Sequence, residues 1–348
     1  MNCKSLLILV SLFVLFYSAA ANDLVGDNTV GQPAAFVQRS DAQAIEVDFV
    51  LPGISLEDIS IGSNHYSLLK IEGEGESGEI GAPEVPIITR LFAIPDDKRV
   101  IIKEIIPTYK TYSGINPFPL QPPEYYDSAN TGDLIFSDKY YQEGGFFPDK
   151  WVTISDPAIY RDYRIIPVNI SPIRVDAATG EAQVLTGLHL ELTFDNGPAA
   201  NVKTKHFNKA VSSFNQVYSQ SIANYDWIDP NGEYVKGSLL IVYPEVTGVM
   251  PILEPLIQWK QRLGYKTTAV SIPNNCPTSV VYAAIQNAYN TYDPPLEAVI
   301  LIGDCIGPLG INCYTYSGGS SDHGFTLLEG DDILGEIVIG RYSVDAIA

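Results

Sequence analysis

The residues best suited to chemistry gather near the C-terminal end of the sequence, directly after an apolar segment over residues 298–302. Gly303 and Asp304 follow that segment, and ligands of open parallel sheets bind beyond the carboxyl ends of the strands. The next loop carries two cysteines, an aspartate and a histidine: Cys305, Cys313, Asp322 and His323. A thiolate needs a base within hydrogen-bonding reach, so one hypothesis makes Cys305 a nucleophile and His323 its base.

A second hypothesis assigns the acidic side chains of the same stretch to a cation. Calcium prefers oxygen ligands, and five carboxylates are available: Asp322, Glu329, Asp331, Asp332 and Glu336. Their spacing is not that of an EF-hand loop. A third hypothesis is structural, with Asp304 capping a helix or loop and residues 329–332 forming a tight turn. These three hypotheses stay open at this point; no cofactor is required by any motif, and calcium is the one candidate.

Four cysteines are too few for a disulfide scaffold, so apolar cores must stabilise the fold. Cys305 and Cys313 could pair across a short loop. Cys276 would then be buried or free.

The first 21 residues have the composition of a cleavable signal peptide. Lys4 precedes an apolar run over residues 6–16, which is shorter than the roughly 20 residues that cross a bilayer. Small residues at positions 18–21 suit a cleavage site. We therefore expect a secreted protein, extracellular or at the cell surface, and we find no later segment long and apolar enough to span a membrane.

The charge and the length narrow the class of protein further. The chain of 348 residues carries 41 acidic and 21 basic side chains, for a formal net charge of −20. Such a surface repels the phosphates of nucleic acids and anionic lipids. A nucleotide site is also disfavoured, because residues 244–248 lack the repeated glycines that approach phosphate and include Glu245. The length favours about two domains of roughly 100–200 residues each.

The first of these domains is expected to be rich in β-strands. Residues 22–40 are polar and contain Gly and Pro, which predicts a flexible arm. From residue 41 to about 200, short runs of alternating apolar residues are separated by Gly and Pro turns, as in a β-sandwich or jelly roll. The clearest hairpin turns at residues 177–180, and its return strand places Leu188, Leu190 and Leu192 on one face and His189 on the other.

Residues 201–236 are predicted to be a linker that contains one amphipathic helix. Apolar residues recur at helical spacing between residues 207 and 218. Four basic residues lie in or beside this segment: Lys203, Lys205, Lys209 and Lys236. Exposed linkers are where nicking concentrates, so we expect maturation by cutting near these lysines.

The last segment, residues 237–348, changes to an α/β pattern. Apolar runs at residues 238–243, 266–272 and 298–302 alternate with helical patterns at residues 250–263 and 278–292. Gly264 marks the end of the first helix. This β-α-β-α-β order predicts a parallel sheet, which is extended by an apolar strand over residues 337–339.

Several of these segments resemble the gingipain-type cysteine peptidases. The resemblance lies in the run at residues 299–304, Ser321-Asp322, the acidic turn at residues 329–332, and the strand that ends in Gly340-Arg341. Trp259, Lys260 and Gly264 also fit a family pattern. Residues 81–86, which precede a strand, resemble the start of the family's propeptide domain.

The resemblance implies the N-terminal portion of a secreted proenzyme. A β-rich prodomain would cover the peptidase, and residues 237–348 would form the first, apparently truncated, part of a caspase-like catalytic domain that acts on proteins or peptides. The family's catalytic His and Cys are expected beyond Ala348. His323-Gly324 imitates the family's His-Gly motif in a different element, so the catalytic role is not transferred and no catalytic residue is assigned. The alternative is a non-catalytic exported binding or surface protein that retains both parts.

Overall fold

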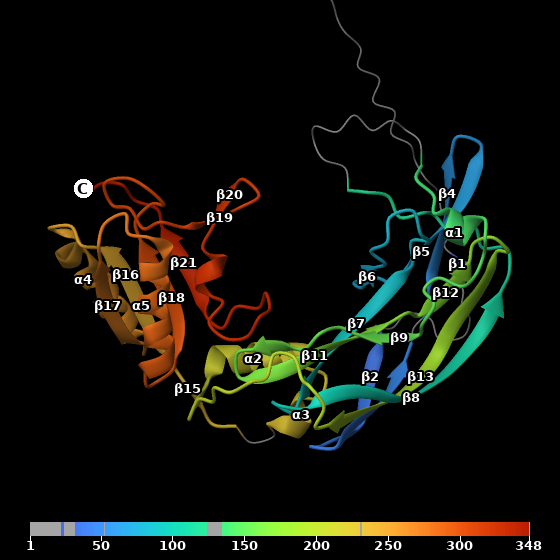
Figure 1. Ribbon diagram of the computed structural model, residues 1–348, viewed down its shortest axis with the longest axis horizontal. Helices are drawn as coiled ribbons and strands as arrows, with labels where there is room; N and C mark the ends of the chain where they lie inside the picture. Colours follow the sequence, from blue (N-terminus) through green and yellow to red (C-terminus); the bar gives the residue numbers. More distant parts are fainter. Residues whose placement is uncertain (1–21, 24–31, 52, 124–133, 230–231, 348) are drawn as a thin grey trace, which may run out of the picture.

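The computed structural model describes residues 22–23, 32–51, 53–123, 134–229 and 232–347 (Figure 1). The expected signal peptide over residues 1–21 lies outside the described residues. Within them, a β-rich region and an α/β region are joined through the short helices α2 and α3, Ser212–Ser221 and Tyr225–Ile228. No helix in the described part of the chain combines the length and the apolar character needed to cross a membrane.

One sheet of the β-rich region is organised around the long strand β13 (Glu181–Asp195). The antiparallel partners of β13 are β12 (Ile173–Asp176), β3 (Ala44–Val50) and β8 (Arg99–Tyr112). The turn predicted at residues 177–180 connects β12 to β13, and the register pairs Asp176 with Glu181. The predicted hairpin is therefore confirmed.

The second sheet follows the order β10-β11-β7-β6, with β9 also paired to β11. Its strands are β10 (Ala158–Tyr160), β11 (Tyr163–Ile170), β7 (Pro86–Ile94), β6 (Gly75–Glu76) and β9 (Val152–Ile154). A smaller sheet contains β1 (Asn22–Asp23), β4 (Ser55–Ile61) and β5 (Asn64–Lys70), and the helix α1 spans Asp138–Tyr141.

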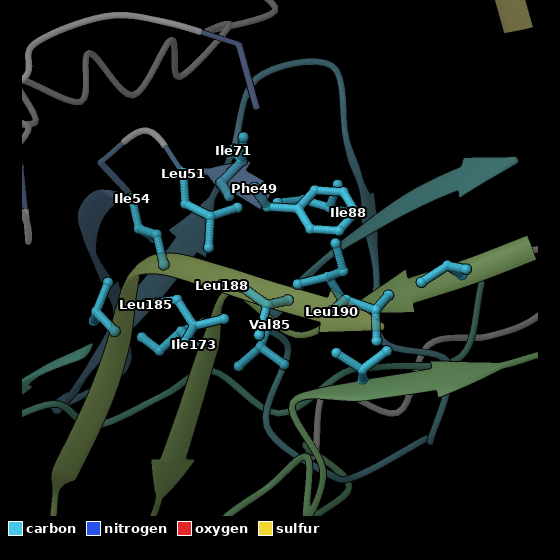
Figure 2. Packing of buried hydrophobic residues seen from close by; sticks show 14 of the residues in the cluster. Phe49, Leu51, Ile54, Ile71, Val85, Ile88, Ile173, Leu185, Leu188 and Leu190 are labelled. Atoms are coloured by element: carbon cyan, nitrogen blue, oxygen red, sulfur yellow. The ribbon is translucent and has the colours of Figure 1, made fainter. Parts of the chain in front are cut away.

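The two larger sheets pack face to face. Phe49 of β3, Ile88 of β7 and Leu190 of β13 lie in one buried cluster, as Figure 2 shows. Leu188 and Leu192 are buried in the same core, whereas His189 points to the other face and contacts Asp48 at 2.6 Å. Strand alternation thus produces the predicted β-sandwich.

The flexible arm predicted over residues 22–40 is wrong for its second half. Residues Ala34–Ser40 form strand β2, which pairs antiparallel with β3 from Ala34↔Val50 to Ser40↔Ile45. β2 lies at the edge of the sheet and none of its residues is fully buried, because only one of its faces meets the core.

The segment predicted to be a linker is largely packed. Phe214, Tyr218 and Tyr225 of α2 and α3 are buried against Ala93 and Ile165 on the second sheet. The amphipathic helix exists, but α2 begins at Ser212 rather than near residue 207. Two short parallel strands, β14 (Ala210–Val211) and β15 (Tyr234–Val235), close the segment.

The α/β region contains the predicted parallel sheet, in the order β17-β16-β18-β21. Its strands are β16 (Ser238–Pro244), β17 (Lys266–Ile272), β18 (Leu296–Ile302) and β21 (Val338–Tyr342). A hairpin of β19 (Tyr314–Tyr316) and β20 (Gly319–Ser321) and a 3₁₀ turn over His323–Phe325 lie between β18 and β21.

The helices α4 (Val249–Arg262) and α5 (Thr278–Thr291) cover opposite faces of this sheet. Alternate residues of β16 face each helix, because strand side chains alternate. Ile241 packs with Leu253 of α4, whereas Leu240 packs with Ile285 of α5. Gly264 has a positive φ of 92° and ends α4 where the sequence predicts.

Candidate functional site

The loop after β18 is shaped by Gly303 and Asp304 at the carboxyl edge of the sheet. Gly303 has a φ of 137°, and a Cβ on this residue would overlap the carbonyl oxygen of Leu309. The amide of Asp304 donates to the carbonyls of Leu309 and Val344, and its Oδ1 accepts the amide of Cys305 at 2.8 Å. The structural hypothesis for Asp304 is thus confirmed, because it caps this loop.

The hypothesis that Cys305 is a nucleophile is wrong. Cys305 forms a disulfide with Cys313, with 5.3 Å between the two Cα atoms, so it offers no thiolate. His323 is exposed and its Nδ1 lies 3.4 Å from the Oγ1 of Thr326. Cys276 is both free and buried, and burial raises the pKa of its thiol.

In the part of the chain that the structure describes, no histidine is hydrogen-bonded to a cysteine. The four histidines contact other side chains, namely Ser60, Asp48, Asp96 and Thr326. The described residues therefore contain no assembled thiolate–imidazole pair.

Arg341 at the end of β21 fastens the loops at this edge. Its guanidinium makes a bidentate ion pair with Asp322, at 2.9 and 2.6 Å. Its Nη1 donates to the carbonyls of Gly303 and Ile311, each at 2.9 Å. One largely buried side chain thus joins the end of β18, the disulfide loop and the segment before the 3₁₀ turn.

Two asparagines after β17, which were not among the predicted site residues, hold the disulfide loop from the other side. Asn274 accepts the amide of Gly310 at 2.6 Å, and Asn275 donates to the carbonyl of Gly307 at 2.8 Å. Adjacent asparagines after a predicted strand were the available signal, since this side chain readily bonds to loop backbone.

The carboxylates proposed for calcium do not gather around one point. Asp322 pairs with Arg341, and Glu329 accepts from Lys203 Nζ at 3.2 Å and from Tyr289 Oη at 3.3 Å. Across residues 22–23, 32–51, 53–123, 134–229 and 232–347, no group of three or more acidic, histidine or cysteine side chains is arranged to hold a metal ion. The described partners of these carboxylates are therefore protein groups, and calcium binding stays a prediction.

The remaining acidic residues organise the turn between the 3₁₀ turn and β21. Asp331 is exposed, and its amide donates to Asn201 Oδ1 at 2.7 Å. Asp332 accepts the amides of Ile159 and Leu334, each at 2.8 Å. These bonds confirm a turn and also attach it to the β-rich region.

Glu336 is fully buried beneath this turn. Its Oε2 accepts the amides of Leu328 at 2.6 Å and Glu329 at 3.2 Å. Burial raises the pKa of this carboxyl to about 7, although the two amide bonds favour the ionised form and partly oppose the shift. Glu336 is thus a proton-binding group inside the α/β region.

Two family models match the chain in tandem. The model Propeptide_C25 matches residues 27–229, more than half of the chain, and the model of peptidase family C25 matches residues 234–348. The chain belongs to the gingipain-type C25 peptidase family. The first match includes α2 and α3, which pack on the β-rich region, and the second contains the whole parallel sheet.

Similar proteins of known name are gingipains of Porphyromonas gingivalis. One gingipain R2 sequence is 23% identical over 77% of this chain and 36% of its own length. A second is 20% identical over 94% of this chain and 45% of its own length. The chain therefore spans less than half the length of these curated C25 relatives.

A solved structure is similar to the chain at the level of the fold. It is described as a complex of Porphyromonas gingivalis RgpB pro- and mature domains. Its match has a TM-score of 0.50 and 17% identity, and covers 56% of this chain and 100% of that chain. At this identity the likeness supports the fold of the C25 precursor and no residue role.

Proposed function

We propose that this chain is the N-terminal portion of the precursor of a secreted, gingipain-like cysteine endopeptidase. The observation that carries the proposal is the tandem match of a propeptide model and a peptidase model to one chain. In the complete protein, a thiolate would attack the scissile carbonyl of a protein or peptide substrate, and a histidine would carry the proton. The residues of this chain would supply latency and part of the catalytic scaffold.

The α/β region fits the role of a scaffold rather than of a complete catalytic centre. Its disulfide, the Arg341–Asp322 pair and the Asn274 and Asn275 bonds hold the loops at the carboxyl edge of the sheet. A rigid edge suits precise placement of substrate, because small displacements are costly to catalysis. The proposed dyad is expected in sequence that follows residue 348 in the complete protein.

We further propose export through the signal peptide at residues 1–21, followed by an extracellular or cell-surface location. An apolar run over residues 6–16 and small residues at positions 18–21 support this step. The partners within the precursor would be the β-rich region and the α/β region themselves, and no cofactor is needed for the proposed chemistry.

The function is tested with the complete precursor, expressed from the native gene. We expect hydrolysis of peptide substrates that is low in the intact precursor and rises after the chain is cut between the propeptide and the peptidase regions. Alkylation should abolish the activity by modifying a cysteine outside this chain. A complete gene product that never hydrolyses peptides would favour the alternative, an exported binding protein.

Limited trypsin digestion is expected to cut first after Lys209 or Lys236, and not after Lys203. Lys209 and Lys236 are exposed, whereas Lys203 is only 3% exposed and paired with Glu329. Proteases nick exposed, weakly held segments, so burial should protect Lys203. Mass spectrometry of the first fragments gives the cut positions, and a first cut after Lys203 or within residues 299–304 would contradict this prediction.

A further inference from the structure

Arg161 occupies an unusual position at the tip of the β10–β11 hairpin. Tyr160 pairs with Tyr163 across the tip, and Arg161 has a φ of 53°, in the left-handed region. Residues with a Cβ rarely adopt this conformation, so surrounding contacts must fix it. The side chain is 0% exposed, although arginine is almost never fully buried unless it is paired.

Aromatic rings from both regions surround the guanidinium of Arg161. Its Cζ lies 4.4 Å from the ring centroid of Phe214 and 4.8 Å from that of Phe207. The third ring is that of Tyr289, at 5.9 Å, and belongs to α5 of the α/β region. A cation is attracted to an aromatic ring more strongly when the pair is shielded from water than when it is exposed to solvent.

Polar contacts hold part of this side chain, whose buried Nε and Nη2 have no hydrogen-bond partner among the described residues. Nη1 of Arg161 donates to the backbone carbonyl of Glu336 at 2.5 Å. Nε lies 3.7 Å from Oδ2 of Asp162, and the same oxygen accepts the hydroxyl of Tyr218 at 2.9 Å. Arg161 therefore joins the β10–β11 hairpin of the β-rich region to the segment of the α/β region that precedes β21.

Residues 329–336 make further contacts with the propeptide part of the chain. Asp332 accepts the amide of Ile159, and the amide of Asp331 donates to Asn201. Lys203, whose side chain is 1% exposed, pairs with Glu329. Each of these contacts joins a residue within 27–229 to a residue within 234–348.

All of this interface lies at the amino edge of the parallel sheet. Tyr289 is in the last turn of α5, just before β18, and Glu336 precedes β21 by two residues. Ser213 of α2 adds a bond of 2.8 Å to Glu297 at the start of β18. Figure 1 shows α2 and β11 beside this lower edge of the α/β region.

We propose that Arg161 is the anchor through which the β-rich region docks on the amino edge of the sheet, and that the affinity between the two regions, once the chain between them is cut, depends mainly on this side chain and the rings around it. The contacts that join residues before 229 to residues after 234 are non-covalent. They therefore do not depend on an intact chain between residues 229 and 234. The inference rests on the proposed function in one respect: maturation of the proposed precursor would cut the chain between the two regions. Central, fully desolvated arginines are frequent hot spots of interfaces.

The experiment uses the full chain with a recognition sequence for a site-specific protease inserted after Gly232. After cutting, the wild-type chain is expected to elute as one species in gel filtration at micromolar concentration. Arg161→Gly should weaken the association about 30-fold or more, as loss of a hot spot does. Glycine suits the left-handed backbone, so this variant removes the side chain without straining the hairpin.

Three further variants make the result specific. Tyr289→Leu alters the other side of the interface and should weaken the association of the cut halves at least about 10-fold. Arg161→Lys should fall between Arg161→Gly and wild type, because lysine lacks the planar fork. Arg99→Ala, at an exposed ion pair with Asp195, is the matched control and should leave the association unchanged.

Two results would overturn the inference: separation of the wild-type halves on cutting, or association of the Arg161→Gly and Tyr289→Leu halves as tight as in wild type. Circular dichroism of each uncut variant identifies a folding defect. If Arg161→Gly misfolds, Tyr289→Leu still tests the interface, because it leaves the hairpin unchanged. Association is measured without any substrate. A complete precursor that lacks peptidase activity would contradict the proposed function but would not affect the measured association of the cut halves.

Discussion

Arg341→Ala is expected to destabilise the α/β region by about 3 kcal/mol, because it removes one partner of a largely buried ion pair. The Asp322 carboxylate, 19% exposed, would lose both of its guanidinium bonds. The carbonyls of Gly303 and Ile311 would lose a donor as well. Urea unfolding of the full chain, followed by hydrogen exchange of amides in β18 and β21, measures the change.

Companion variants separate the ion pair from side-chain truncation. Arg262→Ala removes an exposed arginine from the last turn of α4 and should change the free energy of unfolding by less than about 0.5 kcal/mol. A double variant, Arg341→Met with Asp322→Asn, should recover part of the loss, since no unpaired charge stays buried. Equal stability of Arg341→Ala and Arg262→Ala would show that the pair contributes little.

Local patterns predicted the elements that bury one face. The alternation around Leu188 and Leu190 predicted β13, and the spacing of Val281 and Ile285 predicted the buried face of α5. These patterns work because a strand repeats its faces every two residues and a helix about every 3.6. The parallel sheet followed from the β-α-β-α-β order, because parallel strands need crossovers.

The same patterns could not predict which segments far apart in the sequence contact each other. The segment Ala34–Ser40 falls within the polar arm predicted over residues 22–40, and its pairing with β3 makes it a strand. In a similar way, Phe207 belongs to a helical pattern in the sequence but packs against Tyr289, 82 positions later in the chain. In both cases tertiary contacts override local propensity.

The candidate site shows the same limit. Glu329, Asp332 and Glu336 are close in sequence, which made a shared cation a reasonable hypothesis. Their partners lie far away in the chain, at Lys203 and Ile159, or are nearby backbone amides. An acidic run seen without its partners cannot be told from a metal site, and Arg161 carries no sequence motif that would have revealed its role.

Glu336→Gln is expected to remove a pH dependence of the stability of the α/β region. The pKa of Glu336 is raised from 4.5 to about 7 by burial, so the folded state holds a proton that the unfolded state releases. The stabilising contribution of this protonated group is fully present below pH 4.5 and is lost as the pH rises through about 7. At about 1.36 kcal/mol for each pKa unit, the loss is about 3 kcal/mol.

Urea unfolding of wild type and Glu336→Gln between pH 4 and 8 measures this difference, with hydrogen exchange of α5 and β18 as the readout. The two proteins should have similar stability at pH 4, and the variant should be more stable by about 2–3 kcal/mol at pH 8. Comparing the two cancels the titration of all other carboxylates, and Glu254→Gln on the exposed side of α4 is the matched control. A difference that stays constant across this range would mean that Glu336 titrates alike in the folded and unfolded states.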